Sequence, residues 1–339
     1  MLRVPSIEEF AGQVVVKEAS GKAEPVSASE AQCRVPGGTE NSIEVTVVTV
    51  CFNPLKAGRR EVFLKNLDSV QSQTGVRLEH LIVDGASTDG TVDWLKSYTN
   101  TSHDIRILSK PDSGIYEAMN RAIALARGKY IIYLNSDDYF HDPCGMAVSV
   151  RRIEELDCDF SFAPIRFSDP SVRHNPQLNP QKRLYRFIIS WCFSHQTMLT
   201  SRSLLQRIDG FDTSYRSAAD YDMLLRMIAA GARGCFVPLV FSTFSMGGFS
   251  EENFDDGVAE CVCSLQDFFQ DFYSIEMSHQ EAEYIFTRRV FPSKYIDLYK
   301  QIQKLIRERF IGIPKGPIFW LSYKFNYIKY YLKCRNSSI

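Results

Sequence analysis

Two adjacent aspartates follow an apolar run near the middle of the chain. The run at 130–134 leads through Asn135 and Ser136 into Asp137 and Asp138. Neighbouring carboxylates repel one another, so the pair is either fully solvated or bound to a cation that removes the penalty. Mg²⁺ and Mn²⁺ prefer oxygen ligands. The pair is therefore a candidate metal site.

A third carboxylate, Asp84, ends another apolar run and opens the stretch "DGASTDGT". Ser87 or Asp89 is predicted to cap a helix here, while Gly85 and Gly90 supply permissive backbone. This turn chemistry does not require Asp84. At the end of a strand, its carboxylate is a candidate to accept hydrogen bonds from a nucleobase or a ribose.

The glycine-rich phosphate loops of nucleotide-binding proteins are absent, since the chain contains neither GxGxxG nor GxxxxGK[ST]. A nucleotide diphosphate bound to this chain would need another source of positive charge. A divalent cation held by Asp137 or Asp138 can supply it, because Mg²⁺ commonly uses only one or two carboxylates together with substrate phosphates.

Alternating strand and helix patterns place these residues. Apolar runs at 43–52, 78–85, 104–111 and 129–135 predict strands, and the segments at 60–73, 91–99 and 114–128 predict helices between them. Such alternation implies an α/β fold with a mostly parallel sheet. Ligands bind outside the carboxyl ends of parallel strands. Asn53, Asp84 and the Asp137/Asp138 pair all fall at this edge.

Composition narrows the class of protein. The chain has 339 residues, 45% of them hydrophobic and 23% charged, so it is long enough for one large domain or for a domain with an appendage. A formal charge of −1 gives no basic field, so nucleic acid is not an expected partner. Nine cysteines without a CxxC pair predict reduced thiols, and hence a cytoplasmic protein. No stretch has the length and apolarity of a signal peptide core or a membrane span.

The two ends of the chain differ from its middle. Residues 1–42 are rich in Ala, Glu, Ser, Gly and Pro, which predicts a weakly structured extension. The segment 301–339 carries eight basic residues against one acidic residue, with Tyr and Phe interleaved. Two interpretations remain open for it: peripheral contact with an anionic membrane surface, or a packed C-terminal helix with a solvated basic face.

A set of ordered motifs resembles a known family. The stretches "VTVVTVCFN", "LIVDGASTDGT", "KPDSGIYEAMNRAIALARGKYIIYLNSDD", "SHQTML", "GFD", "AADYDMLLRM" and "FSMGGFS" lie between about 43 and 250. In this order and spacing, they resemble inverting family-2 glycosyltransferases of the GT-A fold, especially bacterial enzymes that build capsule, exopolysaccharide or O-antigen. The resemblance implies a GT-A sheet flanked by helices, with a helical C-terminal extension.

The resemblance also implies roles for individual residues. Phe52 would stack near the nucleobase and Asp84 would hydrogen-bond it. Asp137 and Asp138 match the metal-binding motif of the family, although Asn135 replaces its usual first acid. Asp138 is preferred as the direct ligand, with Asp137 beside it and also near the donor.

Asp220 matches the catalytic base of the family. Its predicted place near a helix N-terminus favours the ionised form, which accepts a proton. The alternatives are that Asp220 only caps the helix, or that Asp222 is the base, since acids two positions apart point to different faces. His195 would contact the acceptor or the diphosphate, or it is a buried structural histidine. Arg226 would hold a carboxylate or is simply solvated.

Two further positions have both a functional and a structural interpretation. Asp112, with Ser113 and Gly114, would contact the donor near its sugar, or would only form a turn ahead of the next helix. Cys51 stands where many relatives carry Thr or Ser. A thiol donates hydrogen bonds poorly, so this loop is predicted to contact nucleotide through its backbone.

The sequence thus predicts three regions: an extension at 1–42, a glycosyltransferase domain at 43–270 and a helical basic and aromatic region at 271–339. Within the domain, 43–143 is the nucleotide-sugar half and 144–270 the acceptor half.

The predicted reaction is an inverting, Mn²⁺- or Mg²⁺-dependent transfer of a sugar from a nucleotide diphosphate sugar, preferentially of uridine, to a saccharide or lipid-linked acceptor. The alternative from another class is a catalytically silent scaffold that binds nucleotide sugar or a partner enzyme. A nucleotidyltransferase or dehydrogenase is a weaker alternative, because the glycine-rich loop is missing.

Overall fold

The structure is a computed structural model, and it describes residues 42–99, 105–169, 189, 194–247, 253–288 and 290–313. The predicted extension at 1–42 lies almost entirely outside these ranges, as does the end of the predicted basic region after residue 313.

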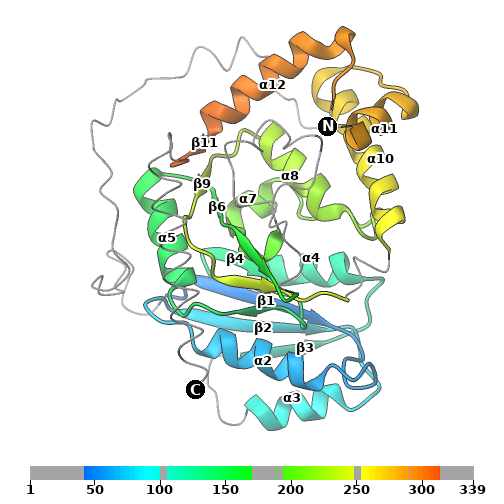
Figure 1. The fold of residues 1–339 in the computed structure, drawn as a ribbon. Coiled ribbons are helices and arrows are strands. Elements are labelled where there is room, and N and C mark those ends of the chain that lie inside the picture. Colours follow the sequence, from blue (N-terminus) through cyan, green and yellow to red (C-terminus); the bar gives the residue numbers. More distant parts are fainter. Residues whose placement is uncertain are drawn as a thin grey trace.

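One large sheet organises the described part of the chain (Figure 1). Its strands run in the order β11-β9-β6-β8-β4-β1-β2-β3, and β8 is antiparallel to both β4 and β6. The other pairings in this sheet are parallel. The strands span Val45–Cys51 (β1), Leu78–Asp84 (β2), Ile105–Ser109 (β3), Tyr130–Tyr133 (β4), Phe160–Phe162 (β6), Leu199–Ser201 (β8), Gly234–Phe236 (β9) and Phe310–Ile311 (β11).

A second, small sheet lies beside the first. It consists of β5 (Tyr139–Phe140), β10 (Ser242–Phe244) and β7 (Ile165–Phe167), with β10 in the middle. Since β5 follows the two adjacent aspartates directly, this sheet brings the segment after β10 next to them.

Helices cover both faces of the large sheet, as Figure 1 shows for α4 and α8 on one side of β1 and β2 and for α2 and α3 on the other. The helices span Arg60–Gln71 (α2), Thr91–Thr99 (α3), Ile115–Leu125 (α4), Gly145–Leu156 (α5), Arg202–Arg207 (α7), Ala219–Ala229 (α8), Phe254–Tyr273 (α10), His279–Arg288 (α11) and Ile296–Arg309 (α12). Short 3₁₀ turns occur at His195–Thr197 and Ser293–Tyr295.

Alternate residues of the central strands enter separate hydrophobic cores. In β1, Val45 and Val47 join the core beneath α5, while Val48 and Val50 join the core beneath α4, α8 and α10. All four are buried. A strand buried on both faces is typical of a parallel sheet covered by helices on each side. The predicted α/β architecture is thereby confirmed, and each predicted strand and helix of the first half is present.

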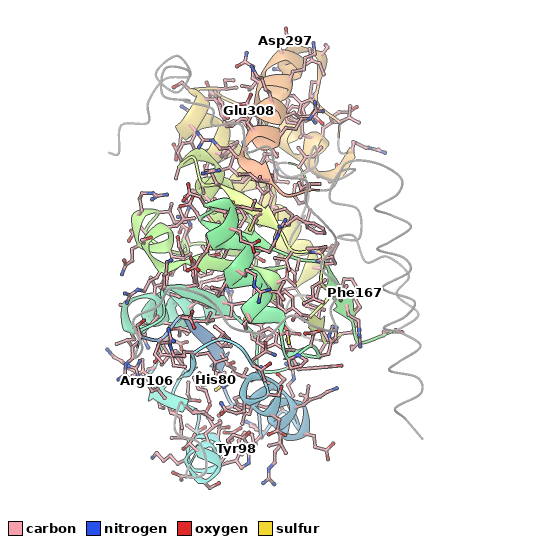
Figure 2. All side chains as sticks on the ribbon, turned by 90° about the vertical axis from the view of Figure 1, so that its left-hand side faces the viewer. His80, Tyr98, Arg106, Phe167, Asp297 and Glu308 are labelled. Atoms are coloured by element: carbon pink, nitrogen blue, oxygen red, sulfur yellow. The ribbon has the colours of Figure 1, made fainter. Side chains whose placement is uncertain are left out.

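The predicted basic C-terminal region begins inside the packed structure. Ile302 and Ile306 of α12 are buried, and β11 pairs with β9 in parallel. Phe310 packs its ring against the rings of Phe160 and Phe162. Residues up to Ile313 are therefore joined to the sheet. Figure 2 shows Asp297 and Glu308 of α12 at the end of the molecule opposite Tyr98 of α3.

Among the residues that the structure describes, no helix combines the length and the apolarity needed to cross a bilayer.

Candidate active site

The two adjacent aspartates lie in a tight loop between β4 and β5, and their surroundings differ. Asp138 is 1% exposed, and both of its carboxylate oxygens accept hydrogen bonds, from the Gln196 side chain (2.8 Å) and from the Ser245 amide (2.8 Å). Burial, followed by the charge of Asp137, raises the pKa of Asp138 to about 7. Asp138 therefore connects this loop to the segments of Gln196 and Ser245, which are distant in the sequence.

Asp137 is more accessible, with 19% of its side chain exposed. Its Oδ2 atom lies 3.3 Å from the Arg59 guanidinium. Burial raises the pKa of Asp137, while the nearby Arg59 and His195 lower it. Of the two predicted metal ligands, Asp137 is thus the one whose carboxylate is partly exposed and faces the Arg59 side chain rather than buried hydrogen-bond donors.

A buried polar network holds this loop from below. The Asn66 side-chain amide donates to the backbone carbonyls of Asn135 and Asp138, both at 2.9 Å. Thr49 Oγ1 lies 3.4 Å from Asn66 Oδ1 and 2.8 Å from His80 Nε2. Thr49 belongs to β1, His80 to β2 and Asn66 to α2. The loop is therefore positioned by two strands of the large sheet and by one helix that covers it.

An exposed aromatic ring marks the carboxyl end of β1. Phe52 is 66% exposed, and a Cβ atom on Gly85 would lie 3.3 Å from the Phe52 ring and 2.9 Å from the Asp112 carboxylate. The three segments that follow β1, β2 and β3 therefore meet here, and a larger residue at position 85 would displace the Asp112 carboxylate. Phe52 and Asp112, predicted to contact the donor, lie on one surface.

Asp84 lies at the end of β2, as predicted, but it is fully buried. Its Oδ2 atom accepts from the Ser87 amide (2.9 Å) and the Ser109 hydroxyl (2.7 Å), while the Cys51 thiol lies 3.6 Å from Oδ1. Cys51 is itself buried, and burial together with Asp84 raises the pKa of its thiol. Asp84 therefore joins the ends of β1, β2 and β3.

The turn before α4 is held by side chains. Glu117 accepts from the amide (2.6 Å) and the hydroxyl (2.7 Å) of Ser113, and Arg121 pairs with Glu117. Asp112 accepts from the Gly114 amide at 3.1 Å, so it also serves the turn. Burial raises the pKa of Asp112. Both interpretations of Asp112 fit this geometry, because its other oxygen points at the surface beside Gly85.

The predicted base, Asp220, lies in the first turn of α8 and contacts His195. His195 Nδ1 is 3.3 Å from Asp220 Oδ2, and the Tyr221 amide donates to Oδ1 at 2.8 Å. The side chain of Asp220 is 21% exposed, so solvent reaches it. The N-cap residue of α8 is Ala218, so Asp220 is not the cap.

The alternative base, Asp222, is committed to an ion pair. Arg226 donates from Nε to Asp222 Oδ2 at 2.7 Å, and Ser264 lies 3.3 Å from Oδ1. Arg226 also donates to the backbone carbonyls of Ile208 and Gly210. Arg226 therefore holds a carboxylate, one of the two roles predicted for it, and Asp222 is buried.

Helix α10 caps the loop that precedes the base. The Glu260 carboxylate accepts hydrogen bonds from the amides of Arg216 (2.8 Å), Ser217 (2.7 Å) and Ala218 (2.9 Å). Ala218 is the N-cap residue of α8, and a carboxylate beside a helix N-terminus is favourable because of the helix dipole. The orientation of Asp220 therefore depends on a helix that starts more than thirty residues later.

Sequence reasoning missed four of these residues: Arg59, Gln196, Ser245 and Glu260. Gln196 adjoins His195 in "SHQTML" and Ser245 opens "SMGG", so both stood inside quoted motifs, but nothing in a motif says which atom it reaches. Arg59 and Glu260 belong to no motif. The sequence contained no signal for them.

The geometry fits a divalent cation in part. Within the described ranges, no three His, Cys, Asp or Glu side chains gather around a common metal position. Asp137 offers an accessible carboxylate, and Asn135 Oδ1 is buried with no hydrogen-bond partner among the described atoms. Two oxygen donors of this kind suit a cation that takes its remaining ligands from substrate phosphates and water.

Comparison with known proteins identifies the family. The model of the glycosyl transferase family 2 matches residues 46–212. An uncharacterized glycosyltransferase of Mycobacterium tuberculosis is 30% identical over 198 residues, which are 54% of this chain and 68% of that protein. The chain belongs to glycosyl transferase family 2. The match to the family model ends before Asp220, so it covers the loop of Asp137 and the donor edge but not the start of α8.

Some relatives are much longer than this chain. Chondroitin synthase of Pasteurella multocida is 31% identical over 168 residues, which are 49% of this chain but only 17% of that enzyme. Among solved structures, a mannosyltransferase of Pyrobaculum calidifontis in complex with GDP-Man and Mn²⁺ superposes with a TM-score of 0.55 and 18% identity, covering 80% of this chain and 74% of that one. This likeness confirms the predicted GT-A fold.

Proposed function

We propose that this family-2 member transfers a sugar from a nucleotide diphosphate sugar to an acceptor hydroxyl, with inversion at the anomeric carbon. The observation that carries the proposal is the place of His195 between the two carboxylates: it lies 3.3 Å from Asp220 and is near enough to Asp137 to lower its pKa. Asp137 offers a carboxylate for a cation, and Asp220 offers a solvent-accessible carboxylate for a proton. The two residues come from separate halves of the chain. The first would help to offset the charge of the leaving diphosphate, and the second would accept the proton of the attacking hydroxyl.

In this reaction Asp220 accepts the acceptor's proton as the hydroxyl attacks. It lies in the first turn of α8, and 21% of its side chain is exposed to solvent. His195 orients it: an ionised carboxylate only accepts, so Nδ1 donates to Asp220 Oδ2. The buried Nε2 atom of His195 has no hydrogen-bond partner among the described atoms, so it is free for a hydroxyl of the acceptor or an oxygen of the diphosphate.

The residues that would hold a divalent cation are Asp137 and Asn135, with Asp138 positioning the loop. This assigns the direct contact to Asp137 rather than to the preferred Asp138, because both oxygens of Asp138 already accept hydrogen bonds. When bound, Mn²⁺ or Mg²⁺ would offset the charge that develops on the departing nucleotide diphosphate. The Mn²⁺ complex of the mannosyltransferase supports a metal of this kind.

The donor edge would hold the nucleotide. Exposed Phe52 offers a face on which a base can stack. Asp84 Oδ1 would exchange the weak hydrogen bond of the Cys51 thiol for an N–H group of the base. Asp112 would contact the donor near its sugar. Uridine remains our preferred base, from the resemblance of the motifs.

The acceptor would be a growing polysaccharide or a lipid-linked saccharide. Similarity to a chondroitin synthase supports the first class of acceptor. Basic and aromatic residues after Ile313 support contact with an anionic membrane surface for the second. Sedimentation with anionic vesicles, with and without residues 314–339, tests this contact; equal sedimentation of the two proteins would refute it.

The Asp220→Asn variant tests the function. With a panel of UDP- and GDP-sugars and both classes of acceptor, the wild type should release nucleotide with one donor. The rate of this release should be at least about a thousandfold lower in the variant. Donor affinity should stay within about twofold, since Asp220 serves the acceptor. The Asp93→Asn variant, on the exposed face of α3, controls for the loss of one carboxylate. Turnover of Asp220→Asn at the wild-type rate would refute the assignment, and binding without turnover by the wild type would favour a silent scaffold.

A further inference from the structure

A guanidinium group lies beside Asp137, the proposed cation ligand, although no motif includes it. Arg59 Nη1 is 3.3 Å from Asp137 Oδ2, and Nη2 is 3.3 Å from the backbone carbonyl of Gly247. Gly247 belongs to the "FSMGG" stretch, whose Ser245 side chain also donates to the Asp137 carbonyl. Arg59 therefore bridges the loop after β1 and the segment after β10 across the candidate metal ligand.

The backbone of Arg59 is anchored while its side chain is not. The Arg59 amide donates to the Pro54 carbonyl at 2.9 Å, and the Arg59 carbonyl accepts from the Phe63 amide at 3.0 Å. The side chain is 37% exposed, and both of its hydrogen bonds are long. A half-exposed ion pair of this length contributes little to stability. The guanidinium can thus turn to a new partner without disturbing α2.

The neighbouring cations are engaged elsewhere. Arg60 lies over the Trp94 ring, 5.7 Å from its centroid, and Lys65 lies over the Tyr139 ring at 3.5 Å. Of these three cationic residues, Arg59 is the one that forms an ion pair with a predicted metal ligand. Its planar fork matches two phosphate oxygens at once, which neither an ammonium nor an amide can do.

We propose that Arg59 is a diphosphate-binding residue of the donor site, held ready by Asp137 and turned onto the phosphates when a divalent cation occupies that carboxylate. This inference rests on the proposed function. Two features of the sequence agree with this role. The chain has no glycine-rich loop to bind phosphates, and Asn135 stands where the family motif has an acid, so one carboxylate fewer competes with the diphosphate for the Arg59 guanidinium. In the structure Arg59 offsets the charge of Asp137; with a donor bound, it would instead offset part of the charge of the diphosphate.

Calorimetry with UDP and Mn²⁺, on the whole chain, tests the inference, with GDP run in parallel. The Arg59→Gln variant should bind the diphosphate about tenfold more weakly than the wild type, which is the loss of one charge-assisted hydrogen bond. The Arg59→Lys variant should lie between them, because it keeps the charge but not the fork. Arg60→Gln, which removes the same charge one residue away, should bind within about twofold of the wild type.

Two further readouts separate a phosphate contact from an effect on the fold. The affinity for uridine, measured by NMR titration, should be equal in Arg59→Gln and the wild type, because uridine has no phosphate. Mn²⁺ alone, followed by the electron paramagnetic resonance of the free ion, should bind more tightly to Arg59→Gln than to Arg60→Gln, since a cation next to Asp137 has gone.

Each contrary result has a distinct meaning. Equal UDP affinity in Arg59→Gln and Arg60→Gln would overturn the inference, as would an equal loss for UDP and uridine. Equal Mn²⁺ affinity in the two variants would overturn the exchange at Asp137. A wild type that binds neither UDP nor GDP would instead remove the proposed function, and the inference would fall with it.

Discussion

At the scale of single residues, the pair of adjacent aspartates divides into two roles. Asp138 is buried, and its carboxylate joins the Gln196 side chain and the Ser245 amide to the loop. Asp137 keeps an accessible carboxylate beside Arg59. Identical residue types next to each other thus differ in exposure and partners, because one points into the contact between the two sheets and the other points out of it.

This division predicts different defects for two isosteric variants. Asp137→Asn should weaken Mn²⁺ binding at least about tenfold with little change in the thermal unfolding midpoint, because an accessible ligand is lost. Asp138→Asn should change the unfolding midpoint more, because an amide cannot accept from both Gln196 and Ser245. Manganese titration and thermal unfolding of the same two proteins provide the comparison. If Asp138→Asn showed the larger loss of Mn²⁺ affinity with an unchanged midpoint, the roles would be reversed.

At the scale of elements, the start of α8 is organised by α10. Glu260, Ser264 and Asp267 recur at helical spacing on one face of α10, and they contact respectively the amides before α8, the Asp222 carboxylate and the Tyr215 hydroxyl. The loop that precedes Asp220 is therefore packed on a helix from outside the region that matches the family model.

The Glu260→Gln variant should separate catalysis from donor binding. Loss of the charge weakens three hydrogen bonds to the amides at 216–218, and a displacement of Asp220 by a fraction of an ångström lowers kcat by about tenfold. UDP affinity should remain within about twofold of the wild type. The Glu283→Gln variant, on the exposed face of α11, is the matched control. A loss of UDP affinity as large as the loss of kcat would show general damage to the fold instead.

At the scale of the whole molecule, a buried histidine couples stability to pH. His80 lies within β2 in the interior, labelled in Figure 2, and burial lowers its pKa from 6.5 to about 3. Between these values the unfolded chain binds a proton that the folded chain does not. The free energy of unfolding therefore falls as the pH decreases through this window, by about 1.4 kcal/mol per pH unit for this group.

Replacing His80 by Gln should reduce the slope of the free energy of unfolding against pH by about 1.4 kcal/mol per pH unit, the contribution of one proton. The Gln side-chain amide can donate to Thr49 Oγ1, whose own proton is directed at Asn66 Oδ1, so the network below the Asp137 loop has a substitute partner. Denaturant unfolding at several pH values between 4 and 6.5 measures the change. His279→Gln, at an exposed position of α11, is the control, and an equal slope in both variants would contradict the assignment.

The sequence by itself determined the alternating strands and helices of the first half and the placement of Asp84, Asp137 and Asp138 at strand ends. The reason is local: β-branched runs and helical spacing of apolar residues depend on near neighbours. It also supported Asp220 as base over Asp222, though only through a resemblance. Ordered motifs are readable in this way because their spacing follows from the elements that carry them.

Only the tertiary structure decided which atoms meet. The contacts of Arg59 with Gly247, of Gln196 with Asp138 and of Glu260 with the start of α8 join segments 188, 58 and about 42 residues apart. No local pattern encodes such a separation, because each contact depends on how the sheets and helices pack. The same packing distinguished an accessible Asp137 from a buried Asp138, which in the sequence are simply two adjacent aspartates.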